Sequence, residues 1–333
     1  MGGSDVDAPK KHYSKATEGN IRDAIWSSGY LLERRVAALL RNSGYKVMTN
    51  RGFFDPEANK AGEYDVYAHK EVEIYGKGSH GIYPTLICEC KNNSQPIAFF
   101  VHDKEEFQPL IDEVRVSGIP AKIWQHNKYI SIQEFTNIIN WHHYCKPIAD
   151  IATQCCTFEQ KFEQKVEYWK ASHDQELHDT EVRIIKAMEH EIDDDFKNMN
   201  QWLLPEETEK EFIDLSLYYP LVIYQGELNT IRIDNNSAQT KDDLIISKCE
   251  HIQYNPEFFS FYDDEVISYH IDIITEKYLP TYLKLIEKEI SEIKQILIQQ
   301  KQNVKHTVGR LIVECQSLEK KPKSYRKYLE YPF

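Results

Sequence analysis

Apolar positions in the first 150 residues follow a helical period once and then shift to runs of strand length. The segment 28–43, SGYLLERRVAALLRNS, predicts an amphipathic helix that ends at Gly44, with one apolar face made of Leu32, Val36, Leu39 and Leu40. Later in this half, a charged helix is predicted, then the segment AKIW at 121–124, then a helix over 130–145. Between them, strands are predicted at 45–50, 63–75, 85–91 and 96–101, with a loop over 51–62 and a turn over 76–81.

Two long apolar stripes dominate the second half. From 158 to 199 apolar residues recur mostly every three or four positions among charged ones, which predicts one long amphipathic helix or two in line. A second stripe opens at Pro280 and runs to Leu318 with heptad-like spacing, which Gly309 loosens. Because a strand-rich segment separates the stripes, we expect the two helices to pack against each other in an antiparallel coiled-coil-like pair.

The strand-rich segment covers about 216–275. It holds a predicted hairpin around the QGE turn at 225–227 and further strands over 243–254 and 268–275. These strands form a small module of their own or extend the sheet of the first half. The expected architecture is α/β: a tail over 1–16, a core with a mixed sheet over 17–150, and a long-helix region over 151–333.

Composition narrows the class of protein. Of the 333 residues, 41% are hydrophobic, which is enough for a substantial core, and the formal net charge is −13. The negative charge argues against a surface coated in basic groups for nonspecific nucleic-acid binding, although a local basic groove stays compatible with it. Seven cysteines without a CxxC pair favour a reducing, cytoplasmic setting. The sequence has no apolar signal core and no run of 18 apolar residues, so no membrane partner is expected.

One predicted strand ends in charged residues. In TLICECK, over 85–91, the strand period places Ile87, Glu89 and Lys91 on one face and the two cysteines on the other. If the strand carrying Asp65 is its neighbour, then Asp65 and Glu89 converge, and two adjacent carboxylates repel unless a cation lies between them. Oxygen ligands favour Mg²⁺ or Mn²⁺, and such an ion activates water and polarises a phosphodiester. Lys91 would orient that water or neutralise charge on the phosphate.

These residues and their order resemble the PD-(D/E)XK, or restriction-endonuclease-like, nuclease superfamily, closest in character to the Mrr-like restriction nucleases. The resemblance covers about 28–101 and includes a glutamate, Glu33, on the helix that precedes the sheet. It implies that Asp65, Glu89 and the main-chain carbonyl of Cys90 bind the metal, that Glu33 assists, and that Lys91 is the catalytic lysine. The proline of the family name is missing, because Tyr64 precedes Asp65.

Simpler interpretations stand beside this one. The E-x-K pattern is common in this chain, and four further copies start at Glu159, Glu163, Glu292 and Glu319, in predicted helices or the tail. Glu89 and Lys91 could form an exposed cross-strand ion pair worth about 0.5 kcal/mol. Glu33 could be an ordinary solvated helix residue. Glu63 is a further ligand or a surface partner of Lys70 or Arg51.

Other reactive side chains carry weaker signals. His142 and His143 are adjacent, so we expect them to point in different directions and to be core or surface residues and not zinc ligands. Cys155 and Cys156 have no recognisable catalytic context. The basic segment 320–327, with its tyrosines, could touch a phosphate backbone but is more simply a solvated terminus.

The resemblance implies a Mg²⁺-dependent nuclease that hydrolyses DNA, with RNA as a weaker possibility, in restriction or antiviral defence. The alternative is a catalytically silent nuclease-fold scaffold that binds a partner protein or a second copy through its long helices. An intact Asp65, Glu89 and Lys91 set favours the enzyme, and the net charge mildly favours the scaffold. A basic groove could come from Arg34, Arg35, Arg41, Lys46, Arg51, Lys60, Lys91 and Lys104.

Overall fold

The structure is a computed structural model of the chain. It describes residues 15–55, 58–75, 81–93, 95–102, 111–163, 166–172, 175–202, 213–233, 240–260 and 265–319. The predicted helix that follows residue 102 falls largely outside these residues, as do most of the N-terminal tail and the basic C-terminal segment.

Thirteen strands of the described part of the chain form one mixed sheet. Ten of them lie side by side in the order β1 (Lys46–Asp55), β2 (Lys60–His69), β4 (Gly81–Asn92), β11 (Asp214–Gln225), β17 (Ile271–Thr275), β14 (His251–Tyr254), β9 (Asp150–Glu163), β5 (Ile97–His102), β12 (Leu228–Ile233) and β13 (Leu244–Cys249). Three more pair at its sides: β3 (Val72–Glu73), β6 (Val116–Ile119) and β10 (Val166–Ser172). The predicted mixed sheet is therefore confirmed. Strands from before and after residue 150 belong to this one sheet, and β5 of the first half lies between β9 and β12 of the second.

Two shorter ladders lie apart from this sheet. They pair β7 (Lys122–Gln125) with β8 (Lys128–Ser131), and β15 (Glu257–Ser260) with β16 (Glu265–Ser268). Short 3₁₀ turns link several elements: Ile111–Glu113, Ile138–Asn140, Lys241–Asp243 and Glu276–Tyr278. The helix predicted over 130–145 is much shorter than expected: α3 covers only Ile132–Thr136. It ends there because Asn137 adopts a left-handed conformation with φ of 53°.

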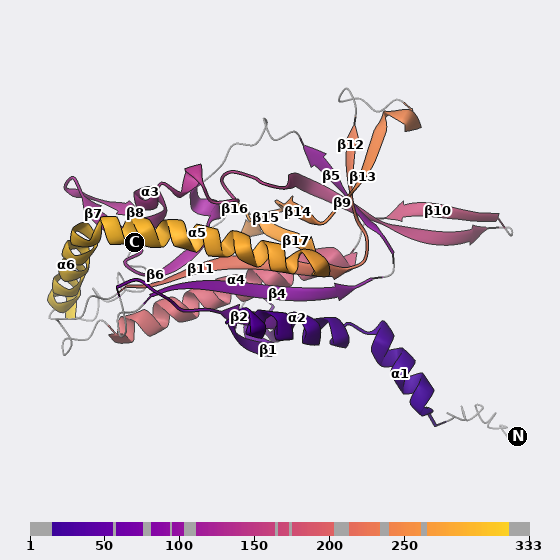
Figure 1. The fold of residues 1–333 in the computed structure, drawn as a ribbon, viewed down its shortest axis with the longest axis horizontal. Coiled ribbons are helices and arrows are strands. Elements are labelled where there is room, and N and C mark those ends of the chain that lie inside the picture. The colour runs from indigo at the N-terminus through magenta and orange to yellow at the C-terminus, as the bar shows by residue number, and fades with distance from the viewer. Residues whose placement is uncertain are drawn as a thin grey trace, which may run out of the picture.

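Helices cover both faces of the sheet (Figure 1). One core packs α2 (Tyr30–Asn42) and α5 (Leu279–Gln299) against the face that carries Leu86 and Cys88 of β4. The other core packs α4 (Gln175–Trp202) against the face that carries Ile87 and Tyr218. The predicted antiparallel pairing of the two long helices is therefore wrong: α4 and α5 bury their apolar stripes on opposite faces of the sheet.

The first stripe is only half helical, which corrects the long-helix prediction. Residues 157–163 and 166–172 pair in a projecting two-stranded ribbon, β9 with β10, and the helix α4 begins only at Gln175 (Figure 1). Phe158 and Phe162 are four positions apart, a spacing that fits one face of a helix and equally one face of a strand. Consequently Glu159 and Glu163 start their E-x-K patterns on a strand and not on a helix.

The second stripe forms two helices, α5 and α6 (Lys301–Glu319), and the break lies at Gln300 and not at Gly309. Pro280 stands in the first turn of α5, as predicted. In the N-terminal half, a first helix α1 (Glu18–Ser27) precedes α2, which ends as expected at Gly44 with φ of 86°. The loop predicted over 51–62 is mostly strand, because β1 runs on to Asp55 and pairs with β2.

The central pair β4 and β11 explains a further correction. No hairpin forms around QGE among the described residues, since β11 pairs in parallel with β4 and β17, whereas β12 pairs with β5 and β13. In β11 nearly every residue is buried on both faces, which is the pattern of a strand inside a covered sheet. Apart from β15 and β16, the strands of 216–275 thus lie within the core sheet.

Candidate functional site

The candidate site lies where β2 and β4 separate. The ladder between them runs from His69–Thr85 to Val66–Cys88 and then ends. Beyond that point the carboxylate of Asp65 takes the place of a backbone partner, because the Cys90 N–H donates to its Oδ2 at 2.7 Å. As predicted, Ile87 lies in the core on one side of β4, and Cys88 and Cys90 lie in the core on the other. The predicted pairing of the two strands is therefore present, and Asp65 lies against the backbone of β4, whereas the convergence of Asp65 and Glu89 on one ion stays a prediction.

The N-terminus of α2 closes the site from the cysteine side. Asn92 at the end of β4 donates to the Ser28 carbonyl at 3.1 Å, which fixes the start of the helix against the strand. A Cβ built on Gly29 would stand 3.6 Å from Glu33 Oε1 and 3.8 Å from the Cys90 carbonyl oxygen. The Glu33 carboxylate and this carbonyl therefore approach the same small space, and Glu33 is half-buried.

Helix α4 contributes charges from the other side. Arg183 Nη1 lies 3.2 Å from Glu89 Oε2, and Lys91 Nζ lies 3.9 Å from the same oxygen. Lys91 also reaches Glu176 Oε1 at 3.5 Å. Arg183 and Glu176 were not expected at this site. Both lie in the apolar stripe that was predicted to pack against the second long helix. Only the packing of α4 over β4 reveals them.

Burial is the largest cause that raises the pKa values of all three carboxylates, and nearby carboxylates add to it. Glu89 is 1% exposed, and burial together with the charge of Asp65 raises its pKa to about 7 despite Arg183 and Lys91. Burial raises the pKa of Asp65, although the Cys90 N–H and the charges of Lys91 and Arg183 pull it down. For Glu33, burial raises the pKa first and the charges of Asp65 and Glu63 add to it.

This donor set suits a hard divalent cation. Three carboxylates and one carbonyl are oxygen ligands of the kind Mg²⁺ and Mn²⁺ take, and carboxylates held together at raised pKa are stabilised when a cation joins them. Their side-chain atoms are not yet gathered around one point, however. Within the described residues, the group of ligand atoms that all lie within 4.8 Å of one another belongs to His142, His143 and Glu289. The carboxylate of Glu89 instead forms an ion pair with Arg183.

The basic residues expected to line a groove are mostly engaged or dispersed. Arg35 binds Glu276, with Nε and Oε1 2.6 Å apart, and Arg51 binds Glu191 at 2.6 Å. Lys70 binds Glu287, so neither it nor Arg51 pairs with Glu63. Lys104 lies outside the described residues. The remaining candidates are exposed on α2 and on the outer strands: Arg34, Arg41, Lys46 and Lys60.

A second polar cluster is fully buried between α5 and the sheet. His143 is 0% exposed and bonds Glu289 through Nδ1 at 2.6 Å and Asp272 through Nε2 at 2.9 Å. Of the two placements expected for these histidines, core or surface, the structure shows the core. Their expected divergence is wrong, since the His142 and His143 rings stack with centroids 4.8 Å apart. Burial lowers the pKa of His142 to about 4.

This buried cluster does not fit a metal. The Tyr144 N–H donates to His142 Nδ1 at 3.1 Å, so the neutral ring carries its proton on Nε2, the atom that faces Glu289. Burial alone would lower the pKa of His143, but Glu289 and Asp272 outweigh it and raise the pKa to about 10. His143 is thus a cation that joins two carboxylates, and neither ring offers a free lone pair.

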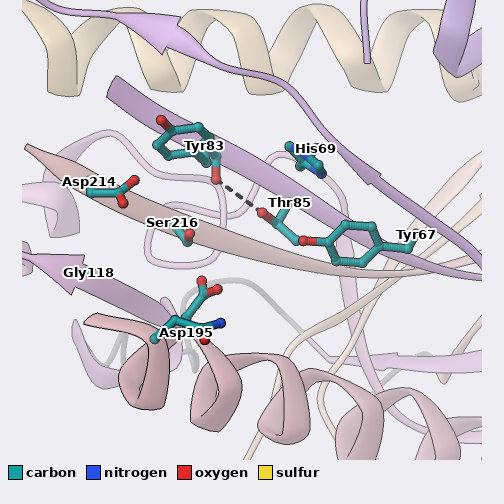
Figure 2. A pocket seen from close by; sticks show the side chains of 9 residues that line it. Tyr67, His69, Tyr83, Thr85, Gly118, Asp195, Asp214 and Ser216 are labelled. Carbon is teal, nitrogen blue, oxygen red and sulfur yellow. Dashed lines mark hydrogen bonds between the residues drawn. The ribbon is translucent and has the colours of Figure 1, made fainter. Parts of the chain in front are cut away.

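A pocket of about 270 Å³ opens on the α4 face of the sheet, away from Glu89. Figure 2 shows Asp195 rising from α4 toward the strands that carry Thr85 and Ser216. Thr85 lies on the same strand as Glu89 but four residues earlier, which is roughly 13 Å along a strand. The pocket is therefore separate from the carboxylate site.

No family model matches the chain, and neither the curated proteins nor the solved structures contain a match. Within the described residues, no helix is both long and apolar enough to cross a membrane.

Proposed function

We propose that the protein is a divalent-metal-dependent nuclease that hydrolyses phosphodiester bonds, with DNA as the preferred substrate. The observation that carries the proposal is that Asp65, Glu89 and Glu33 each approach the end of β4 with a raised pKa, with Lys91 beside Glu89. Buried carboxylates with raised pKa values in a charged site are typical of functional centres.

Each residue has a distinct task in this proposal. Asp65, Glu89 and the Cys90 carbonyl would hold Mg²⁺ or Mn²⁺, and Glu33 would hold it from α2 or orient its water. When bound, the ion supplies a water of lowered pKa and neutralises charge on the phosphate. Lys91 positions the attacking water or faces the charge that develops on the phosphate. Arg183 holds Glu89 in place until the ion binds, and it is then free to contact the phosphate.

The finer assignments follow the same proposal. The helix α2 with Glu33, the strand of Asp65 and the E-x-K strand occur in the order typical of the restriction-endonuclease-like fold, and we assign the core to that type. Six of the seven cysteines are free thiols, which supports a cytoplasmic setting. Restriction or antiviral defence is the proposed context.

The test is nicking of supercoiled plasmid. With Mg²⁺ the native chain is expected to nick, and both EDTA and the Lys91→Ala substitution should reduce the rate at least a hundredfold, since the lysine acts on the reacting groups. The matched control is Lys161→Ala, because Lys161 ends another E-x-K pattern on an exposed strand. Nicking that persists in EDTA and in Lys91→Ala would remove the proposed mechanism.

One observation favours the silent scaffold as a second candidate. Arg183 already pairs with Glu89, and a fixed guanidinium would satisfy that carboxylate without any metal. Titration with Mn²⁺ separates the two candidates. An enzyme should bind Mn²⁺ in the native chain and about tenfold or more tightly in Arg183→Ala, whereas a silent site should bind none in either.

A further inference from the structure

Strand β13 ends the large sheet with an open edge. It pairs with β12 on one side, and no described strand pairs with its other side. The β12–β13 register runs without a shift from Leu228–Cys249 to Ile233–Leu244, so no bulge interrupts the edge. A regular edge strand presents free N–H and C=O groups, and soluble proteins usually protect such an edge with bulges, prolines or lysines. The first three residues of β13 have none of these.

The same strand exposes three consecutive aliphatic side chains. Leu244 is 40% exposed, Ile245 51% and Ile246 61%. On one face, the β12–β13 register places the buried Ile231 beside Ile246 and the exposed Ile233 beside Leu244, so three of these four aliphatic side chains are exposed. On the other face Ile245 lies beside Arg232.

We propose that β13 pairs with β13 of a second copy of this chain, in antiparallel fashion, about a two-fold axis at Ile245. Residues that oppose each other across a two-fold axis perpendicular to the sheet must point to the same face. The axis therefore lies midway between the two copies of a single residue. With Ile245 on the axis, Leu244 opposes the second copy's Ile246. One row then crosses the interface in the order Ile231, Ile246, the second copy's Leu244 and the second copy's Ile233. The two-fold symmetry generates a second, identical row.

Neighbouring registers fit less well. An axis at Ile246 would place Leu244 against the second copy's Lys248, and an axis at Leu244 would place Ile246 against the second copy's Asp242. The Ile245 register also brings Asp242, in the turn Lys241–Asp243 that precedes β13, opposite the second copy's Lys248, which already pairs with Glu227 of its own chain. This complementarity of β13 with itself, in both apolar rows and charge, is the reason that a second copy is the occupant.

The proposal differs from dimerisation through the long helices, because α4 and α5 bury their apolar stripes against the sheet. It is also independent of the nuclease proposal, since it needs neither a divalent ion nor nucleic acid. A single strand pair is a small interface, so the dimer is expected in the micromolar range of dissociation constants.

Sedimentation velocity over about 1–200 µM tests the proposal. The native chain is expected to dimerise, and Ile245→Lys should raise the dissociation constant at least tenfold, because it places two like charges at the axis. The control is Ile298→Lys, an aliphatic of similar exposure (44%) on α5, which should dimerise like the native chain. A native chain that stays monomeric throughout this range, or a dimer that survives Ile245→Lys, would overturn the proposal.

Disulfide trapping tests the register. Ile245→Cys should cross-link to itself under mild oxidation, because the two residues oppose each other across the axis. Ser247→Cys should not, since its copies would lie roughly 13 Å apart along the strands, beyond the reach of a disulfide. Cross-linking of Ser247→Cys but not of Ile245→Cys would reject the register. The native chain, with its own cysteines, gives the background.

Discussion

Glu89 shows how one buried side chain links stability to function. Its carboxylate is 1% exposed, stands near Asp65, and has a pKa of about 7. A carboxyl group that holds its proton more tightly when folded than when unfolded stabilises the fold at low pH and loses that contribution as pH rises. The contribution of Glu89 to the free energy of unfolding should therefore decrease as the pH rises from about 4.5 to 7.

The first prediction concerns Glu89→Gln. At pH 8, without divalent ions, the variant should be more stable than the native chain by about 1–3 kcal/mol, because it removes a buried charge repelled by Asp65. Near pH 4.5 the two should be equal, since both side chains are then neutral. Urea unfolding at the two pH values measures the difference.

The control for this variant is Glu276→Gln, which removes a partly exposed carboxylate that already has Arg35 as its partner. It should not stabilise the protein at pH 8. A Glu89→Gln variant that is less stable than the native chain at pH 8 would show that Arg183 and Lys91 already compensate the charge. In that case a divalent ion would have little to neutralise.

At the scale of elements, one buried ion network joins α5 to the sheet. His143 lies between Glu289 of α5 and Asp272 of β17, and Asp272 also bonds His251 of β14 at 2.6 Å. Tyr282 of α5 donates to Asp272 as well. Since both carboxylates are buried, the positive charge of His143 is what makes their burial tolerable.

The second prediction is that His143→Gln destabilises the protein by about 3–5 kcal/mol near pH 6.5, because it leaves two buried carboxylates without a cation. The pKa of His143 is about 10 when folded, above its ordinary value, so its contribution is complete below about pH 6.5 and is lost as pH rises toward 10. The penalty should therefore shrink by pH 9.5. Urea unfolding at both pH values measures it.

His178→Gln is the matched control, because His178 is an exposed histidine on α4. It should change the free energy of unfolding by less than about 0.5 kcal/mol. A penalty for His143→Gln that is the same at pH 6.5 and 9.5 would mean that packing, and not the charge of the imidazolium, stabilises the cluster.

At the scale of the whole molecule, the sheet interleaves distant parts of the chain. The ladder between β4 and β11 is parallel and extends from Leu215–Ile82 to Gln225–Asn92. The apolar stripe of α4 covers one face of this region, and that of α5 covers the other. The segment that the sequence suggested as a separate core, 17–150, contains none of β11, α4 or α5.

The third prediction follows from that arrangement. A fragment of residues 17–150 should fail to fold cooperatively, because β4 would lose α4 from one face, α5 from the other and β11 from one edge. Thermal melting followed by circular dichroism should show no sharp transition, and coexpression with residues 151–333 should restore it. A fragment that melts as sharply as the full chain would show that the N-terminal half is an independent domain.

Sequence alone determined the local features that depend on period and on side-chain chemistry. The helix at 30–42 with its stop at Gly44, the faces of β4 with Glu89 opposite Cys88 and Cys90, and the meeting of Asp65 with the end of β4 were all predictable. Each follows from neighbours in sequence or from one adjacent strand. The roles of Glu33 and Lys91 in catalysis stay predictions.

Tertiary structure decided which segments become partners. Phe158 and Phe162 fit a helix as well as a strand, and the chain forms a ribbon there because the preceding residues already pair with β5. The β11 run fits a hairpin as well as a buried central strand, and it pairs with β4 because both of its faces are apolar. Arg183 reaches Glu89 only because α4 crosses that face of the sheet. Spacing along a chain constrains neighbours, whereas contacts between segments a hundred residues apart depend on which apolar faces cover one another.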